Sequence, residues 1–117
     1  RDPQDQRLMT TASFTSDGSR LTGFTVRGHS GLADSGEDIL CAAVTSAVRL
    51  TECAINDVLG LGAAVHVDET DAAVSLKLPR ALEGEAESVC QTLLASLMVY
   101  LVQLQEEYPD NIIVMEV

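Results

Sequence analysis

The sequence predicts an α+β fold: a two-layer sandwich with two helices packed on one face of a mainly antiparallel sheet, in the order ββαββαβ. Two long stretches carry apolar residues at helical spacing, and five shorter stretches alternate or are β-branched, as strands are. Aromatic residues make up only 3% of the chain, against 46% hydrophobic residues, so we expect an aliphatic core. A length of 117 residues corresponds to one domain.

The domain is expected to begin at Met9. Residues 1–8 are mostly polar and carry no periodic pattern, and we interpret them as a disordered or artificially added N-terminus outside the fold. Residues 9–15 and 21–27 are rich in Thr, Val and Phe and predict two antiparallel strands. The segment 16–19 between them contains Asp-Gly, the signal of a short hairpin loop.

The first predicted helix spans Asp38 to Leu59, where apolar positions recur every three and four residues and form one buried stripe. Its start has two possible caps: Ser35 with Asp38 as a variant capping box, or Asp38 itself. With Asp38 as the cap, Cys41 lies in the first turn, where unpaired N–H groups and the helix dipole favour an anion. With Ser35 as the cap, this argument weakens. The glycine-rich segment 60–62 ends the helix.

A second hairpin is predicted next. Residues 63–68 and 74–78 alternate between apolar and polar positions on either side of a turn at 69–71. The alternation places Val67 on the apolar face together with Ala63 and Val65, which lie four and two residues before it. It places His66 on the solvent face, where we expect an ordinary surface residue.

The last two elements are a helix and a strand. Residues 83–107 have the strongest helical pattern in the chain, and residues 112–117 form a short β-branched run. Within this helix, residues 97–102 are apolar nearly all round. Two explanations remain open: a second subunit covers this part, or the helix is wedged between the sheet and the first helix.

Charge and cysteine content limit the classes of partner. The formal net charge is −11, and such a surface repels nucleic-acid phosphates and anionic lipid but attracts a basic polypeptide. Acidity is also a common route to solubility. The most apolar run, 93–102, is far shorter than the roughly 20 residues that span a bilayer, so no membrane segment is expected. Three cysteines without a CxxC pair or a secretory leader indicate a reducing cytoplasm.

Cys41 and His29 are the candidate catalytic pair. A thiol attacks a carbonyl as the thiolate, and an imidazole can take the thiol proton and later protonate the leaving amine. His29 lies in the glycine-framed segment Gly28-His29-Ser30-Gly31, twelve residues before Cys41. The alternatives are that Cys41 is a small buried hydrophobe and that His29 caps backbone groups. Asp38 either orients His29 or caps the helix.

The other candidate ligands predict no site. Cys53 and Cys90 lie within helices and are expected to be structural. A zinc site requires ligands at paired short spacing, which these cysteines and histidines lack. The segment 60–62 follows a helix and does not open one, as a phosphate-binding loop would. We therefore expect neither a metal nor a cofactor.

The framing of these two residues resembles a known signature. Gly28-His29-Ser30-Gly31, then Gly36, then the segment 38–44 with Asp38 and Cys41 resemble the ribosomal-processing cysteine protease family, Prp, and the resemblance extends more loosely over residues 9–117. It implies a single cysteine-protease domain in which Cys41 and His29 are catalytic and Asp38 is a third candidate. It also implies a substrate loop, with Gly28 as a hinge, built from the following residues: Gly28, Ser30, Gly31 and Gly36.

The resemblance also implies a substrate and an assembly. The family's substrate is the N-terminal extension of a basic large-subunit ribosomal protein, processed in the cytoplasm by a homodimer. That extension ends in an aromatic pair followed by a small residue, so a hydrophobic groove near Cys41 is expected. Ser30 stands where the family often has alanine, and Thr45 where it often has serine. Both changes keep size or hydroxyl, so we expect activity to survive.

Two other functions compete with proteolysis. One is a thiol redox sensor at Cys41, which lacks a nearby resolving cysteine unless the fold brings one close. The other is a non-catalytic, ribosome-associated binding protein, for which the acidic surface would be the functional feature.

Overall fold

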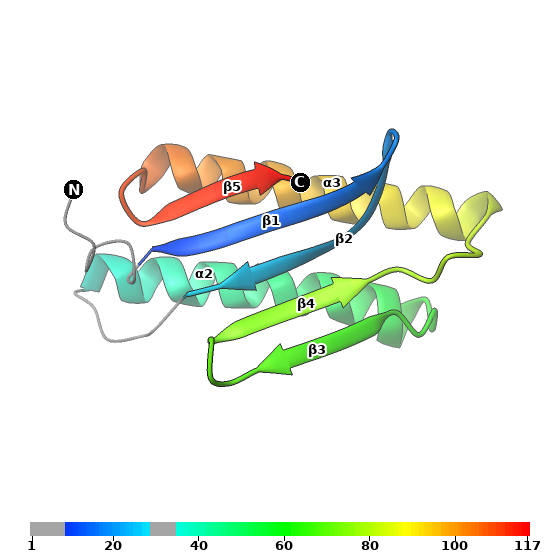
Figure 1. Cartoon of the computed structure of the whole chain (residues 1–117), viewed down its shortest axis with the longest axis horizontal. Helices are drawn as coiled ribbons and strands as arrows, with labels where there is room; N and C mark the ends of the chain where they lie inside the picture. Colours follow the sequence, from blue (N-terminus) through cyan, green and yellow to red (C-terminus); the bar gives the residue numbers. More distant parts are fainter. Residues whose placement is uncertain (1–8, 29–34) are drawn as a thin grey trace.

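The order of elements agrees with the predicted ββαββαβ. The computed structural model describes residues 9–28 and 35–117, with residues 35–38 described by their backbone alone. Its elements, in chain order, are β1 (Thr10–Asp17), β2 (Arg20–Arg27), α2 (Ser35–Glu52), the π-helix η1 (Cys53–Val58), β3 (Ala64–Asp68), β4 (Ala73–Lys77), α3 (Gly84–Glu107) and β5 (Ile112–Glu116). The two long helices lie on one face of a five-stranded sheet, which confirms the α+β sandwich (Figure 1).

The sheet is mainly antiparallel, as predicted. Its strand order is β3-β4-β2-β1-β5, and the pair β1–β5 is parallel while the other neighbours are antiparallel. The strands β3 and β5 therefore form the two edges of this sheet. In Figure 1, β3 is the strand farthest from α3.

The first hairpin is tighter than predicted. β1 continues into the predicted loop 16–19 as far as Asp17 and β2 begins at Arg20, which leaves a turn of only Gly18 and Ser19. Gly18 has φ +64°, and the favoured two-residue hairpin turns require positive φ at their first central position. A bulge between Thr15 and Ser16 shifts the register just before this turn.

The start and end of the first helix both differ from the prediction. α2 begins at Ser35, so Asp38 is not the N-cap but the fourth residue of the helix. Cys41 is therefore the seventh residue, beyond the first turn in which N–H groups lack helical partners. The apolar period could not reveal this start, because the first four residues, Ser35 to Asp38, contain no large apolar side chain.

The last turns of this helical stretch are a π-helix. Residues 53–58 adopt it, and the Leu59 N–H continues the i→i+5 pattern by donating to the Ala54 carbonyl. Ile55 is fully buried there. Asn56 holds the connection to β3, since its amide accepts from the Ala63 N–H at 2.7 Å and donates to the Ala63 carbonyl at 3.1 Å.

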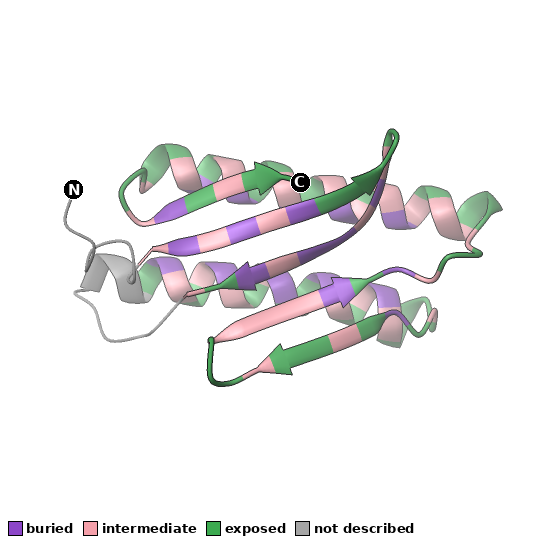
Figure 2. Cartoon of the chain, in the orientation of Figure 1, coloured by how far each residue is buried: buried purple, intermediate pink, exposed green. Residues whose placement is uncertain are grey.

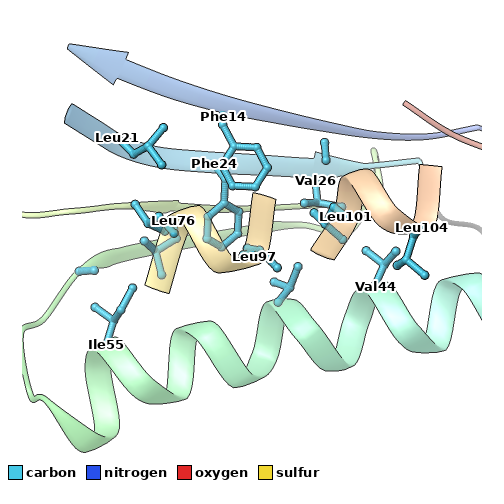
Figure 3. Close-up of a cluster of buried hydrophobic side chains, with 14 of the residues drawn as sticks. Phe14, Leu21, Phe24, Val26, Val44, Ile55, Leu76, Leu97, Leu101 and Leu104 are labelled. Atoms are coloured by element: carbon cyan, nitrogen blue, oxygen red, sulfur yellow. The ribbon is translucent and has the colours of Figure 1, made fainter. Parts of the chain in front are cut away.

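The core lies between the sheet and the two helices. It is largely aliphatic, as expected, but two phenylalanines stand at its centre: Phe14 and Phe24, with ring centroids 5.9 Å apart and planes tilted by 45°. Leucines of α3 and apolar residues of α2 and η1 point toward these rings (Figure 3). The labelled members of this cluster are Phe14, Leu21, Phe24, Val26, Val44, Ile55, Leu76, Leu97, Leu101 and Leu104.

Polar side chains join α3 to the start of β2. Gln91 accepts from the Leu21 N–H and donates to the Leu21 carbonyl, both at 2.8 Å. Arg20 donates to the Glu87 carboxylate and to the Pro79 carbonyl. These contacts hold the N-terminal half of α3 in register with the sheet.

Both helical segments also meet a length and composition test for membrane spans. The segments 39–58 and 84–107 each have a mean hydropathy of 1.3 over a spanning window, whereas the sequence prediction considered only the shorter run 93–102. Each segment contributes a stripe to the core beneath the sheet. Core helices of globular proteins pass the same test, so this hydropathy is weak evidence for a membrane span.

Phe24→Ala should lower the free energy of unfolding by about 3–5 kcal/mol, because it leaves a cavity at the centre of the core. Urea denaturation followed by circular dichroism measures the loss. Thr25→Ala, one residue along β2 and half-buried, is the control and should cost about 1 kcal/mol or less. Equal losses for the two variants would contradict this assignment of the core.

Candidate active site

Cys41 lies on one flank of the buried stripe of α2. The stripe includes Leu40 and Val44, each 1% exposed, whereas Cys41 is half-buried. Cys41 is therefore less buried than the core residues on either side of its stripe, although its role stays a prediction. Its position leaves the thiol at the boundary between the core and solvent.

The residues predicted to face Cys41 lie outside the described part of the chain. His29, Ser30 and Gly31 belong to residues 29–34, of which nothing is described. The elements on either side, β2 and α2, meet at one end of the molecule: β2 ends near the start of α2 (Figure 1).

Gly28, the predicted hinge, is hydrogen-bonded to one carbonyl group and packed closely against another. Its N–H donates to the Ala72 carbonyl at 3.2 Å, and its φ is +90°. A Cβ at this position would lie 2.6 Å from the Met9 carbonyl oxygen. No other residue fits this site without backbone movement, so Gly28 is an anchor at the end of β2.

The turn between β3 and β4 supplies the carbonyl group that accepts the hydrogen bond from Gly28. Asp68 accepts from the N–H groups of Thr70 and Asp71, at 3.0 and 3.2 Å. Ala72 follows with φ +50°, the one non-glycine residue with positive φ among the described residues. The turn is thus built to present the Ala72 carbonyl to Gly28.

Gly36, which was predicted for the substrate loop, is helical instead. Gly36 and Asp38 both lie in the first turn of α2, which begins at Ser35. Asp38 is three residues before Cys41, and residues at this spacing lie on the same side of a helix. Its backbone position is compatible with the orienting role, while its role as N-cap is wrong.

The other two cysteines differ from each other. Cys90 is fully buried, and this burial raises the pKa of its thiol; the nearby Glu87 carboxylate raises it further, while Arg20 lowers it. Cys53 is exposed on the π-helix, so its predicted structural role finds no support in burial. His66 is exposed, as predicted. Within residues 9–28 and 35–117, no three His, Cys, Asp or Glu side chains gather as metal ligands.

An apolar cleft opens on the Cys41 side of α2. It has a volume of about 730 Å³ and lies between α2 with η1 and the helix-facing side of β2, β4 and β3. We call it the α2 cleft. Its lining residues are Val26, Val44, Thr45, Val48, Arg49, Leu50, Glu52, Cys53, Asp57, Val67 and Val74. Val44 and Thr45 are one helical turn beyond Cys41, so the cleft begins next to the thiol.

Val67 shows why the cleft stays open. The alternating pattern correctly placed it on the helix-facing side, opposite Val74, but Val67 is 63% exposed. The reason is that β3 is the edge strand and carries no buried residue (Figure 2). The edge of the sheet therefore extends beyond α2 and forms one wall of the cleft.

A second, smaller groove lies on the other flank of α2. This α2/α3 groove has a volume of about 390 Å³ and is lined by residues of α2, the start of η1, and α3. Its lining includes Ala43 and Ala47 from α2, and Tyr100 from α3. Within the described chain, no protein segment covers this groove, and Leu50 and Tyr100 beside it are 71% and 41% exposed.

Comparison with known proteins identifies the family. The family model described as cysteine protease Prp matches residues 9–113. The chain belongs to the Prp family of cysteine proteases. The ribosomal-processing cysteine protease Prp of Bacillus subtilis (strain 168) is 28% identical over 92 residues, which is 79% of this chain and 82% of that protein.

Solved structures of Prp and of a streptococcal protein share the fold. Staphylococcus aureus Prp with a substrate peptide superposes with a TM-score of 0.78 at 21% identity, covering 93% of this chain and 100% of that one. The same enzyme with a covalently linked product peptide gives 0.72 at 23% identity and the same coverage. A Streptococcus mutans protein gives 0.83 at 21% identity, covering 95% and 96%. This Prp-family chain therefore has the Prp fold.

Iodoacetamide at neutral pH should modify Cys41 and Cys53 of the folded protein and leave Cys90 unmodified. Cys90 is protected because its side chain is buried and its raised pKa keeps the thiol neutral. Peptide-resolved mass spectrometry measures the three sites. Unfolding in denaturant is the control and should make Cys90 as reactive as Cys53. Native labelling of Cys90 at the rate of Cys53 would contradict its placement in the core.

Proposed function

We propose that this chain is a cysteine endopeptidase that removes the N-terminal extension of a large-subunit ribosomal protein, with the Cys41 thiolate as nucleophile and His29 as general base and acid. The observation that carries the proposal is the match of residues 9–113 to the Prp family. The position of the half-buried Cys41 beside an apolar cleft supports it, since a protease needs a thiol that substrate can reach.

The proposed reaction follows the usual course of thiol proteolysis. His29 takes the proton of Cys41, and the thiolate sulfur bonds to the scissile carbonyl carbon. The C–N bond then breaks as the imidazolium protonates the leaving amine, which leaves a thioester on Cys41. Water, deprotonated by His29, hydrolyses that thioester and regenerates the thiol. Asp38, on the same side of α2 as Cys41, is proposed to orient His29.

The substrate and compartment are supported by chemistry. The Bacillus subtilis relative carries ribosomal processing in its name, and the Staphylococcus aureus enzyme was solved with a substrate peptide. A net charge of −11 attracts a basic ribosomal protein and repels RNA phosphates, so direct RNA contact is not part of the proposal. Ribosomal proteins are made in the cytoplasm, where we place this enzyme.

The redox-sensor alternative lacks a resolving cysteine among the described residues. Cys53 lies on the same continuous helical stretch as Cys41, about 18 Å farther along its axis at 1.5 Å per residue. Cys90 is buried in the core. Cys53 is too far away for a disulfide with Cys41, and the buried thiol of Cys90 is a poor resolving group, which favours proteolysis over redox sensing.

Cys41→Ala and His29→Ala should each lower cleavage of the full-length ribosomal protein by about 10⁴-fold or more, because each removes a member of the covalent mechanism. Intact-mass spectrometry of timed incubations measures the product, and circular dichroism verifies the fold. Cys53→Ala is the matched control and should retain wild-type cleavage. Cleavage by Cys41→Ala at the rate of the control would overturn the proposal.

We also propose that the enzyme is a homodimer whose subunits meet at the α2/α3 groove. This groove is apolar, and large apolar side chains beside it are exposed: Leu50 by 71%, Val99 by 54% and Tyr100 by 41%. Contiguous exposed apolar surface of this kind is typical of interaction sites. A two-fold dimer would pair the groove with itself and cover the segment 97–102 that is apolar nearly all round.

Tyr100→Asp should convert the dimer to a monomer, since it places a charge in the apolar contact on both subunits. Size-exclusion chromatography with light scattering measures the mass. Ile113→Asp is the control, because Ile113 is equally exposed, at 42%, but lies on β5. A wild-type chain that elutes as a monomer at high concentration would refute the dimer.

A further inference from the structure

We infer that the hollow between the second half of α3 and β5 is an exosite for the mature part of the substrate protein. It binds a basic segment with apolar side chains, at least about six residues after the scissile bond. This inference rests on the proposed proteolytic function and adds a second binding surface, away from Cys41 and the α2 cleft. Its basis is a charge asymmetry in the sequence, the apolar lining of the hollow, and the place of the hollow in the fold.

Positive charge is absent from the C-terminal part of the chain. Residues 81–117 contain seven acidic side chains and no lysine, arginine or histidine. They form α3 and β5, which pack against each other. Arg20 of β2 reaches Glu87 near the start of α3, whereas Glu106, Glu107 and Glu116 form no ion pair with any described residue. The second half of α3 and β5 therefore carry uncompensated negative charge, which attracts a basic polypeptide.

The α3/β5 hollow combines this charge with apolar surface. Its volume is about 500 Å³, within the usual range of ligand pockets, about 300–1,000 Å³. Its apolar lining includes Met98, Val102, Val114 and Met115. Two of the three methionines of the chain are thus found here, and flexible thioether side chains adapt to the shape of a partner. The charged residues of the lining are Glu106 and Glu116, both exposed, so the hollow fits a segment in which lysine or arginine neighbours apolar residues.

Gln105 prevents the partner from binding as an added strand. The Val117 N–H donates to the Phe14 carbonyl of β1 at 2.9 Å, and N–H groups three residues apart in a strand point in opposite directions. The Val114 N–H therefore points away from β1, and it donates to the side chain of Gln105 of α3 at 2.7 Å. A partner strand would find this N–H at the centre of β5 already occupied. The exosite must therefore recognise side chains.

The hollow lies across the helix layer from Cys41. β3 and β4 wall the α2 cleft and β5 walls the hollow, and β3 and β5 are opposite edges of the sheet. Two helices, each about 10 Å wide, separate the two sites, so an extended chain needs about six residues to span them at about 3.3 Å per residue. The start of α2 and the end of α3 lie at the same end of the molecule (Figure 1), so the chain need not run along its length.

The mature part of the substrate is the occupant that this position favours. Residues next to the scissile bond are held at Cys41 and cannot reach the hollow. The body of a basic ribosomal protein can reach it, and its lysines and arginines complement the two glutamates of the lining. Attraction at a distance from the reacting atoms raises the affinity for the whole substrate protein and leaves the chemical step unchanged.

Kinetics with two substrates test the charged part of the exosite. Glu106→Gln combined with Glu116→Gln should raise KM for the full-length ribosomal protein about fivefold and leave kcat unchanged, because two exposed ion pairs are lost far from the reacting atoms. A short peptide that ends about four residues after the scissile bond cannot reach the hollow at about 3.3 Å per residue. Its KM should therefore keep the wild-type value.

The matched control has the same net charge. Glu83→Gln combined with Glu85→Gln removes two exposed carboxylates at the start of the same helix, and KM for the full-length protein should stay within about twofold of the wild type. An equal rise in KM for the control would reduce the effect to net charge and overturn the exosite. An unchanged KM in the Glu106 and Glu116 variant, or a rise with the short peptide as well, would also overturn it.

A pair of substitutions on β5 tests the apolar part. Met115→Ser should raise KM for the full-length protein about threefold, because it removes apolar contact with the substrate. Ile113 is similarly exposed, at 42% against 40% for Met115, but it does not line the hollow, so Ile113→Ser should leave KM unchanged. Light scattering verifies the mass of each variant. A lower mass for Met115→Ser would assign the hollow to subunit contact and refute the exosite.

A binding measurement separates this inference from the proposed activity. The Cys41→Ala protein should bind the fluorescently labelled mature ribosomal protein, made without its extension, and the added Glu106→Gln and Glu116→Gln changes should weaken binding about fivefold. The Glu83 and Glu85 changes should not. This result would support the exosite even if the wild-type protein cleaved no substrate, which would count against the protease alone. Equal binding by the two double variants would reject the exosite whether or not cleavage occurs.

Discussion

Burial of one stripe of α2 against the sheet is the constraint on which the site depends. With Leu40, Val44 and Val48 in the core, the rotation of the helix is determined, and Cys41 must lie at the edge of that stripe. A rotation of one residue, about 100°, would place the thiol in the core or on the groove side. The hydrophobic energy that holds the fold together therefore also holds Cys41, the proposed nucleophile, beside the cleft.

The sequence predicted the layers because each depends on a period that extends over many residues. It missed features that depend on a single position. Asp38 was a plausible N-cap by residue type, but the helix continues back through a polar first turn that carries no apolar signal. The π-helix at 53–58 is invisible to a 3.6-residue period. Val67 was placed on the correct face, yet its exposure follows from the position of β3 at the sheet edge, which pattern alone does not reveal.

The same distinction applies to the site. Cys41 and His29 were predicted as a pair because a glycine-framed histidine and a helical cysteine form a local signature, and this pairing stays a prediction. The cleft was expected only as a groove somewhere near Cys41, since its walls come from Val26, Val67 and Val74, which three different strands bring together. Long-range pairing of this kind requires the strand order, and strand order is the part of an antiparallel fold that a single sequence determines least.

The two sides of α2 have different proposed functions, one in subunit contact and the other in substrate binding. A dimer that covers the α2/α3 groove leaves the α2 cleft open, because β3 and β4 wall the cleft on the far side of the helix. Leu50 is the one residue that lines both the α2/α3 groove and the α2 cleft. Contact at the groove would order this exposed leucine and with it one edge of the cleft. Subunit association and substrate binding would then be coupled through a single helix, with no change in the sheet.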